Sequence, residues 1–125
     1  IVMSSKKITD AMIVHCIDFR IQKHINRWLD EHIGEGNFDR LSLAGSVLDF
    51  EAVFKQVQLS GRLHEIKKVV FVNHEDCGAY GKDGGKERHA EDLRAARENI
   101  DERCVRDLDV ELYYLHLDGT FESVS

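Results

Sequence analysis

The sequence predicts an α/β fold, a single domain in which helices flank a central and mostly parallel β-sheet. Short apolar runs alternate along the chain with longer segments of helical spacing, and this alternation is typical of βαβ units. The run 69–72 contains four consecutive apolar residues, three of them β-branched, as expected of a central strand that is covered on both faces. With 125 residues, the chain has the length of one domain, so we expect residues 1–125 to form a single unit.

Four strands are expected, with a possible short fifth strand at the edge of the sheet. In chain order they are 11–16, 38–43, 67–73, 110–117 and 120–124. Asp118 and Gly119 predict the turn that joins the last two strands. If strand two lies on one side of strand one and strand three on the other, the strand order reverses between strands one and three.

The first two helices have sequence signals at their ends. The first helix follows Arg20 and ends near Gly34, which fits a helix stop. The second helix is expected to begin at Ser46, because Asp49 three residues later resembles a capping box. It is expected to end around Gly61.

A glycine-rich segment precedes the third helix. Its glycines predict a flexible loop and are Gly78, Gly81, Gly84 and Gly85. The helix itself is charged and is expected over about 87–106. Its apolar stripe consists of Leu93, Ala96, Ile100 and Cys104. We therefore expect Cys104 to be a buried, unreactive thiol.

The composition excludes several classes of protein. The formal net charge is −6, and without a dense basic stripe this argues against a nucleic-acid or anionic-membrane partner. No apolar run approaches the roughly 20 residues of a transmembrane helix. Residues 1–7 lack the apolar stretch of a signal peptide, so we expect a cytoplasmic protein. Its three cysteines therefore do not predict a disulfide framework.

Two short polar motifs follow strands whose carboxyl ends the sheet order brings to one crevice. Cys16 follows the first strand, and His74 and Cys77 follow the third. Two thiolates and one imidazole are a ligand set suited to zinc, and three protein ligands leave a fourth position open, as in catalytic zinc sites. The spacing alone is equally compatible with a buried cysteine beside an unrelated histidine and cysteine.

Asp18 and Arg20 add a catalytic element beside the expected metal. In an extended segment residues i, i+2 and i+4 share a face, so both side chains can point the same way as Cys16. An arginine that pairs with a carboxylate through two hydrogen bonds keeps it ionised as a hydrogen-bond acceptor. Zinc lowers the pKa of bound water to around 7, and the carboxylate can accept a hydrogen bond from the resulting hydroxide. The alternative is an ordinary surface ion pair, which contributes little.

These residues resemble the signature of the β-class carbonic anhydrases, C-x-D-x-R followed by H-x-x-C-G. The two parts of the signature are matched at 16–20 and at 74–78. Segment 40–45 is similar to the family's R-N-A-G-N segment, and segment 114–124 resembles its closing strands. The resemblance extends in matching order over most of the chain.

The resemblance implies a fold, a cofactor and an activity. The fold is a parallel sheet of order 2-1-3-4 in a homodimer or a larger homo-oligomer. The reaction is the reversible hydration of carbon dioxide to bicarbonate by zinc-bound hydroxide. The implied site residues are the zinc ligands Cys16, His74 and Cys77 and the catalytic pair Asp18 and Arg20.

Two alternatives use the same metal site. One is a hydrolase of carbon disulfide or carbonyl sulfide, and the other is a catalytically silent zinc-binding or bicarbonate-sensing module in which Asp18 closes the metal. Phe19 departs from the family, which often has serine there, and only 15 residues precede Cys16, so the family's N-terminal helices are expected to be missing. Three side chains near the motifs receive no role as proton shuttles: His15, His24 and Tyr80.

Overall fold

The computed structural model describes residues 7–125, and its central feature is a five-stranded sheet of order β2-β1-β3-β4-β5. The strands are β1 (Ala11–His15), β2 (Phe38–Ser42), β3 (Lys68–His74), β4 (Asp109–Leu115) and β5 (Phe121–Ser123). The first four pair in parallel, and β5 pairs antiparallel with β4. The predicted order 2-1-3-4 and the short fifth strand at the edge are confirmed.

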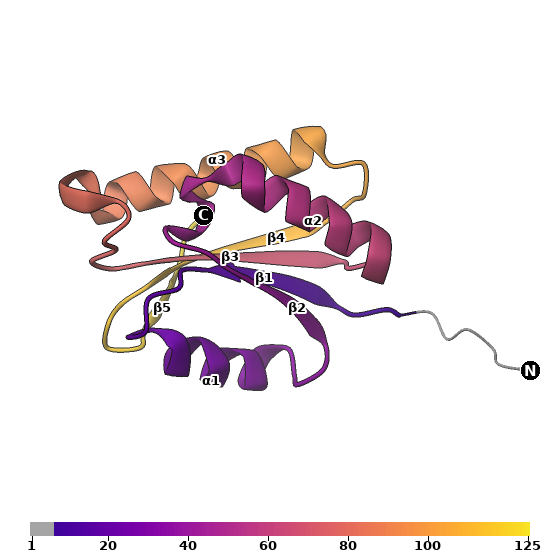
Figure 1. The fold of residues 1–125 in the computed structure, drawn as a ribbon, viewed down its shortest axis with the longest axis horizontal. Coiled ribbons are helices and arrows are strands. Elements are labelled where there is room, and N and C mark those ends of the chain that lie inside the picture. The colour runs from indigo at the N-terminus through magenta and orange to yellow at the C-terminus, as the bar shows by residue number, and fades with distance from the viewer. Residues whose placement is uncertain (1–6) are drawn as a thin grey trace, which may run out of the picture.

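Helices cover both faces of the sheet, so the molecule has three layers (Figure 1). α1 (Gln22–His32) lies on one face, and α2 (Phe50–His64) and α3 (Lys86–Arg103) lie on the other. Two 3₁₀ turns, η1 (Ser46–Leu48) and η2 (Gly81–Asp83), precede α2 and α3.

The predictions about the N-terminal segment fall largely on residues 1–6, outside the described part of the chain. Between residues 7 and 125, no helix has both the length and the apolar character needed to cross a bilayer.

The central strand β3 packs against apolar side chains on both of its faces. Val69 and Phe71 belong to the core cluster under α2 and α3, and Val70 and Val72 belong to the cluster under α1. All four side chains are 0% exposed. Successive side chains of a strand point to opposite faces, so the unbroken apolar run buries two faces at once, as predicted.

The predicted start of the second helix at Ser46 is wrong. α2 begins at Phe50, and its N-cap is Asp49, whose side chain accepts a hydrogen bond from the backbone N–H of Ala52. Ser46 lies in η1 with a φ of +54°, and its hydroxyl donates to the backbone carbonyl of Val14 in β1. The Ser46 hydroxyl bonds to the sheet and is therefore not a helix cap.

The predicted end of this helix at Gly61 is also wrong, because α2 continues to His64. Glu65 ends it with a left-handed φ of +52°, and its N–H donates to the carbonyl of Gly61. A Cβ at Gly61 would lie 3.3 Å from Nε of Arg106. Glycine at this position leaves room for the neighbouring Arg106 side chain, and it does not end the helix.

α3 ends at Arg103, before the predicted end at residue 106. Its last residue reaches across to α2, where the Arg103 guanidinium donates to both carboxylate oxygens of Glu51 at 2.7 and 2.8 Å. Cys104 is the C-cap, with an extended backbone. The predicted burial of Cys104 is therefore wrong: the residue lies beyond the helix and is half-buried.

Candidate metal centre

The carboxyl ends of the parallel strands β1 and β3 lie side by side, at the left-hand edge of the sheet in Figure 1. Cys16 directly follows β1, His74 is the last residue of β3, and Cys77 lies in the turn after it. All three residues are buried, and their ligand atoms lie within 4.8 Å of one another. The structure thus brings together the three residues that the sequence singled out as ligands.

The geometry of these groups fits a zinc ion. The sulfurs of Cys16 and Cys77 are 3.9 Å apart, and two zinc–sulfur bonds of about 2.3 Å at a tetrahedral angle would place them about 3.8 Å apart. Nδ1 of His74 donates to the carbonyl of Glu75 at 2.7 Å, so the lone pair of Nε2 is available to a metal. Nε2 is buried without a hydrogen-bond partner among residues 7–125. A bound cation removes the free-energy cost of leaving this buried nitrogen unpaired.

The two thiols have different environments. Burial by itself raises the pKa of Cys16, but the nearby ring of His74 and the N–H of Gly45, 3.4 Å from the sulfur, outweigh it and bring the pKa to about 7. Burial raises the pKa of Cys77, and the charge on Cys16 raises it further. Two thiolates in contact repel each other, so a cation between them is what allows both to be deprotonated.

Asp18 and Arg20 form a two-point ion pair beside the cluster. Nη2 of Arg20 lies 2.7 Å from Oδ2 of Asp18, and Nε lies 3.1 Å from Oδ1. The backbone N–H of Arg20 also donates to Oδ1 at 2.9 Å, which closes a turn through the aspartate side chain. β1 ends at His15, so this turn, and not the predicted extended strand, brings the pair together.

The ion pair keeps Asp18 charged. Hydrogen bonds from Arg20 lower the pKa of Asp18 to about 2. Oδ2 of the ionised carboxylate lies 3.8 Å from Nε2 of His74. A hydrogen-bond acceptor that is ionised at neutral pH therefore lies directly beside the three candidate ligands.

Two further side chains hold this loop and were not predicted from the sequence. The carboxylate of Asp76 accepts a hydrogen bond from Nη1 of Arg20 at 3.1 Å, and its backbone carbonyl accepts one from Nη2 at 2.9 Å. The amide of Gln22 donates to the carbonyls of Cys16 and Asp18 at 3.1 and 2.7 Å. The position of Asp76 inside the H-x-x-C motif was a usable signal, whereas no sequence pattern indicates Gln22.

Gly45, which has a left-handed backbone conformation, lies beside Cys16. Gly45 has a φ of +81°, and a Cβ there would lie 2.9 Å from Cβ of Leu48 and 3.2 Å from Cβ of Ala79. Only glycine fits this conformation and this space, and its N–H points at the sulfur of Cys16. The segment that resembles R-N-A-G-N thus contributes a backbone donor to the cluster.

Two apolar side chains that neighbour Asp18 in the chain are exposed. Ile17 and Phe19, on either side of Asp18, are 59% and 86% exposed. The three side chains left without a role as proton shuttles are all buried, namely His15, His24 and Tyr80. Their burial agrees with a structural use.

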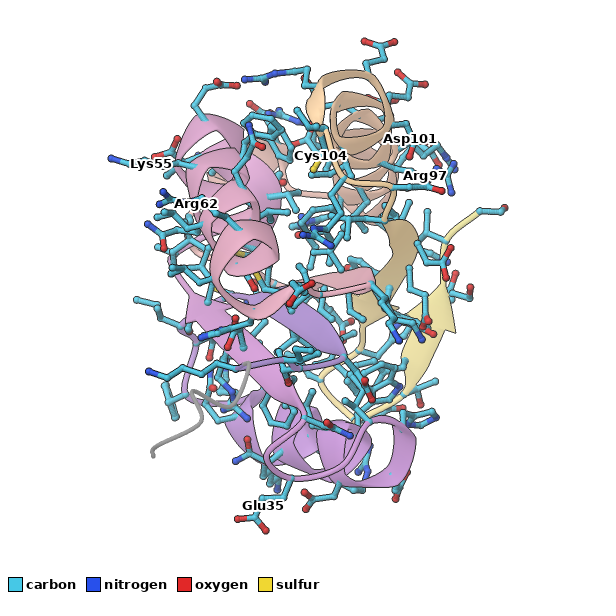
Figure 2. All side chains as sticks on the ribbon, turned by 90° about the vertical axis from the view of Figure 1, so that its right-hand side faces the viewer. Glu35, Lys55, Arg62, Arg97, Asp101 and Cys104 are labelled. Atoms are coloured by element: carbon cyan, nitrogen blue, oxygen red, sulfur yellow. The ribbon has the colours of Figure 1, made fainter. Side chains whose placement is uncertain are left out.

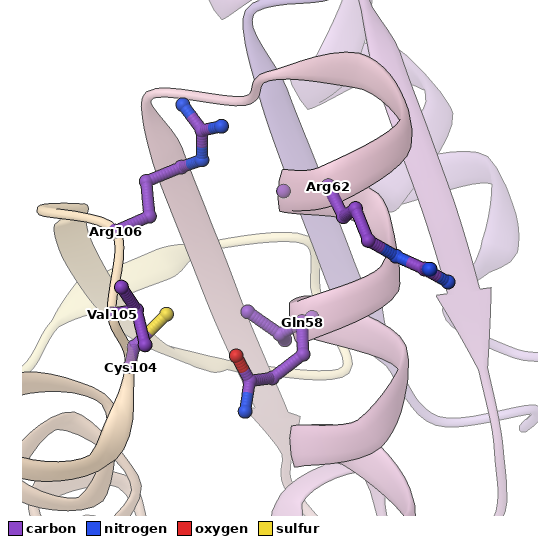
Figure 3. A pocket seen from close by; sticks show the side chains of 7 residues that line it. Gln58, Arg62, Cys104, Val105 and Arg106 are labelled. Carbon is purple, nitrogen blue, oxygen red and sulfur yellow. The ribbon is translucent and has the colours of Figure 1, made fainter.

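A groove of about 370 Å³ lies at the other end of the sheet, between α2 and the segment that joins α3 to β4 (Figure 3). Gln58 points toward Cys104 across it, whereas Arg62 points away. Figure 2 shows the same face of the molecule, with Cys104 between the ends of α2 and α3. No histidine or carboxylate lies among the residues that line this groove, so it lacks the ligands of a metal centre.

Comparison with known proteins supports the resemblance. A family model described as "Putative carbonic anhydrase" matches residues 6–125. An uncharacterized protein of Rickettsia bellii (strain RML369-C) is 28% identical over 133 residues, which cover 91% of this chain and 80% of that protein.

Two solved structures share the fold. The carbonic anhydrase from Glaciozyma antarctica has a TM-score of 0.71 at 14% identity, with 98% of this chain and 87% of that chain covered. The β-carbonic anhydrase isoform I of Trichomonas vaginalis has a TM-score of 0.65 at 16% identity, with the same coverage of 98% and 87%. At these identities the two structures establish the fold, and the family model establishes descent over nearly the whole chain. The chain therefore belongs to the carbonic anhydrase family.

Proposed function

We propose that this protein is a zinc-dependent enzyme that interconverts carbon dioxide and bicarbonate, with Cys16, His74 and Cys77 as the metal ligands. The observation that carries the proposal is the 3.9 Å separation of two buried sulfurs beside an unpartnered imidazole nitrogen. The ionised, arginine-paired carboxylate 3.8 Å from that nitrogen adds to it. Membership in the carbonic anhydrase family supports the choice of substrate.

The residues of the chain have separate tasks in this reaction. Zinc, when bound, supplies a Lewis acid that makes a coordinated water acidic near neutral pH. Asp18, held in place by Arg20, accepts a hydrogen bond from the attacking water and so turns a lone pair of the water oxygen toward the carbon of carbon dioxide. Because its pKa is about 2, Asp18 does not retain the proton that hydration releases.

The test is stopped-flow hydration of carbon dioxide on protein whose zinc content is measured in the same sample. We expect one zinc per chain and a turnover that chelation removes and added zinc restores. One zinc per chain without turnover refutes the activity but not the metal centre, and turnover of carbonyl sulfide in that sample would favour the hydrolase. No zinc even after reconstitution refutes both the centre and the activity.

The 3.8 Å distance between Asp18 and His74 also favours a second candidate, a catalytically silent zinc module. If Arg20 releases the carboxylate, Oδ2 is close enough to become a fourth ligand and close the site. Turnover that stays absent at mildly alkaline pH, in protein with one zinc per chain, would support this candidate. Turnover at neutral pH would exclude it.

We also propose that the protein forms a homodimer or a larger homo-oligomer with Ile17 and Phe19 in the interface. Phe19 and Ile17 lie two residues apart and are 86% and 59% exposed, and exposed apolar surface often marks interaction sites. In sedimentation experiments, Phe19→Ser should shift the protein toward monomer. Val105→Ser is the matched control, because Val105 is 96% exposed at the other end of the sheet, and it should leave the assembly unchanged.

A further inference from the structure

A buried polar network lies behind the candidate metal centre, with Asn73 in its middle. Asn73 is 1% exposed, and its Nδ2 donates to the hydroxyl of Tyr80 and to Nδ1 of His89, each at 2.9 Å. Its Oδ1 accepts a hydrogen bond from the backbone N–H of Val47 at 3.5 Å. Both donors and the acceptor of the amide are used, so its orientation is determined by its neighbours.

The network continues from Tyr80 to helix α3. The hydroxyl of Tyr80 donates to Oδ2 of Asp92 at 2.8 Å, and the same oxygen accepts a hydrogen bond from Nε of Arg88 at 3.2 Å. Burial, reinforced by Asp92, raises the pKa of Tyr80, so the hydroxyl keeps its proton and remains a donor. The chain of hydrogen bonds thus has one direction, from Asn73 through Tyr80 to Asp92.

His89 is locked as a neutral ring on the other side of Asn73. Its Nδ1 accepts the amide hydrogen of Asn73, so the ring carries its proton on Nε2. The ring centroid lies 3.9 Å from that of Tyr80 and 5.5 Å from that of Tyr114. Two aromatic rings and the amide together hold His89 in one orientation.

This network is attached to two of the candidate ligands through the backbone. Asn73 directly precedes His74 at the end of β3, and the backbone N–H of Tyr80 donates to the carbonyl of Cys77 at 3.1 Å. The Asn73–Tyr80 hydrogen bond therefore closes the loop that contains both ligands, and Asp92 ties that loop to the first turns of α3. Within this network the Asn73 amide and the Tyr80 hydroxyl make all their hydrogen bonds, although Nε2 of His89 has no partner among residues 7–125. These buried hydrogen bonds hold the loop in one arrangement.

We propose that Asn73, Tyr80 and Asp92 are positioning residues that set the separation of His74 and Cys77 and thereby the affinity of the site for zinc. This inference rests on the proposed function, because it takes these two residues as ligands. The network touches no ligand atom and acts only through the backbone of the 74–77 loop. Residues that hydrogen-bond to metal ligands typically change the metal affinity of a site by 10- to 100-fold when they are mutated. We expect an effect in this range from residues that hold the backbone of the ligands.

The test is zinc competition with a chromophoric chelator, together with the visible spectrum of the cobalt(II)-substituted protein. Tyr80→Phe keeps the ring against His89 and removes only the hydroxyl. Tyr113→Phe is the matched control, because the hydroxyl of Tyr113 also donates to a carboxylate, that of Glu111 at 2.7 Å, but is not part of the Asn73 network. We expect Tyr80→Phe to raise the zinc Kd by about 10- to 100-fold and to change the cobalt spectrum, and Tyr113→Phe to change neither.

If Tyr80→Phe does not fold, Asp92→Ala and Asp92→Asn provide the same comparison from the helix surface. Asp92→Ala removes the acceptor and should weaken zinc binding, whereas Asp92→Asn retains an oxygen acceptor and should restore much of the affinity.

Variants that lose thermal stability as metal-free proteins but keep the wild-type zinc Kd and cobalt spectrum would overturn the inference. If the proposed metal centre does not exist, the wild-type protein itself will take no zinc from the chelator. That result is distinct from a change seen only in the variants.

Discussion

The two ends of the sheet both carry cysteine, yet only the carboxyl end has the surroundings of a metal centre. There, Cys16 and Cys77 are buried 3.9 Å apart, and an unpartnered nitrogen of His74 lies beside them. At the amino end, Cys104 is half-buried at the end of a helix, and it belongs to no group of three potential metal ligands among residues 7–125.

The difference follows from the parallel sheet. Parallel strands deliver the loops that follow them to one edge, so residues far apart in the sequence converge there. The type of side chain is therefore not sufficient, because a ligand also needs partners that the topology places within a few ångströms.

The largest difference between the two ends of the sheet is expected when one cysteine at each end is replaced. Cys77→Ala should reduce bound zinc from one per chain to none that is measurable, because one thiolate and one imidazole hold zinc much more weakly than three ligands do. Cys104→Ala should keep one zinc per chain. Metal analysis by mass spectrometry after dialysis checks both variants, and zinc lost from Cys104→Ala would contradict the assignment of the two ends.

The next largest effect is on catalysis. Asp18→Ala should keep its zinc and lose about 10²- to 10⁴-fold in kcat/KM, the usual range for a residue that handles the proton of the attacking group. Asp107→Ala, at the exposed amino end, is the control and should retain full activity. Full activity in Asp18→Ala would remove the carboxylate from the mechanism.

Acid should weaken the network behind the candidate metal centre. Burial lowers the pKa of His89 to about 4, below the value of about 6.5 expected in the unfolded chain. The neutral ring thus contributes stability that is complete above pH 6.5 and is lost as the pH falls toward 4. Between pH 7 and pH 5 the loss should be about 2 kcal/mol.

Urea unfolding of metal-free protein at the two pH values measures this loss. In His89→Gln, whose side chain does not titrate, the fall in the free energy of unfolding should be smaller by about 2 kcal/mol. An identical fall in both proteins would show that His89 is not responsible.

The smallest effect is expected at the amino end. Val105 is 96% exposed, and substitutions at such surface positions usually change stability by less than about 0.5 kcal/mol. Val105→Ser should therefore leave the free energy of unfolding, measured with urea, within that range. A loss of more than about 1 kcal/mol would mean that this end of the sheet is covered in solution.

The sequence alone determined the fold and the set of candidate ligands. The alternation of apolar runs and helical segments predicted a parallel α/β sheet, and the resemblance to the β-class carbonic anhydrases implied its strand order 2-1-3-4. Once that order is known, Cys16 and the 74–77 motif must meet, because both follow adjacent parallel strands. Asp18 and Arg20 were also recognisable, because their contact depends on neighbours in the chain.

Only the tertiary structure decided the details that depend on contacts between distant segments. The start of α2 differs from prediction because Ser46 bonds to β1, and the last residue of α3, Arg103, bonds to Glu51 of α2. The network around Asn73 joins β3, the following loop and α3, and no local pattern encodes such a meeting. Sequence periodicity reports which face of an element is buried, whereas the partner of each buried polar atom is chosen by packing.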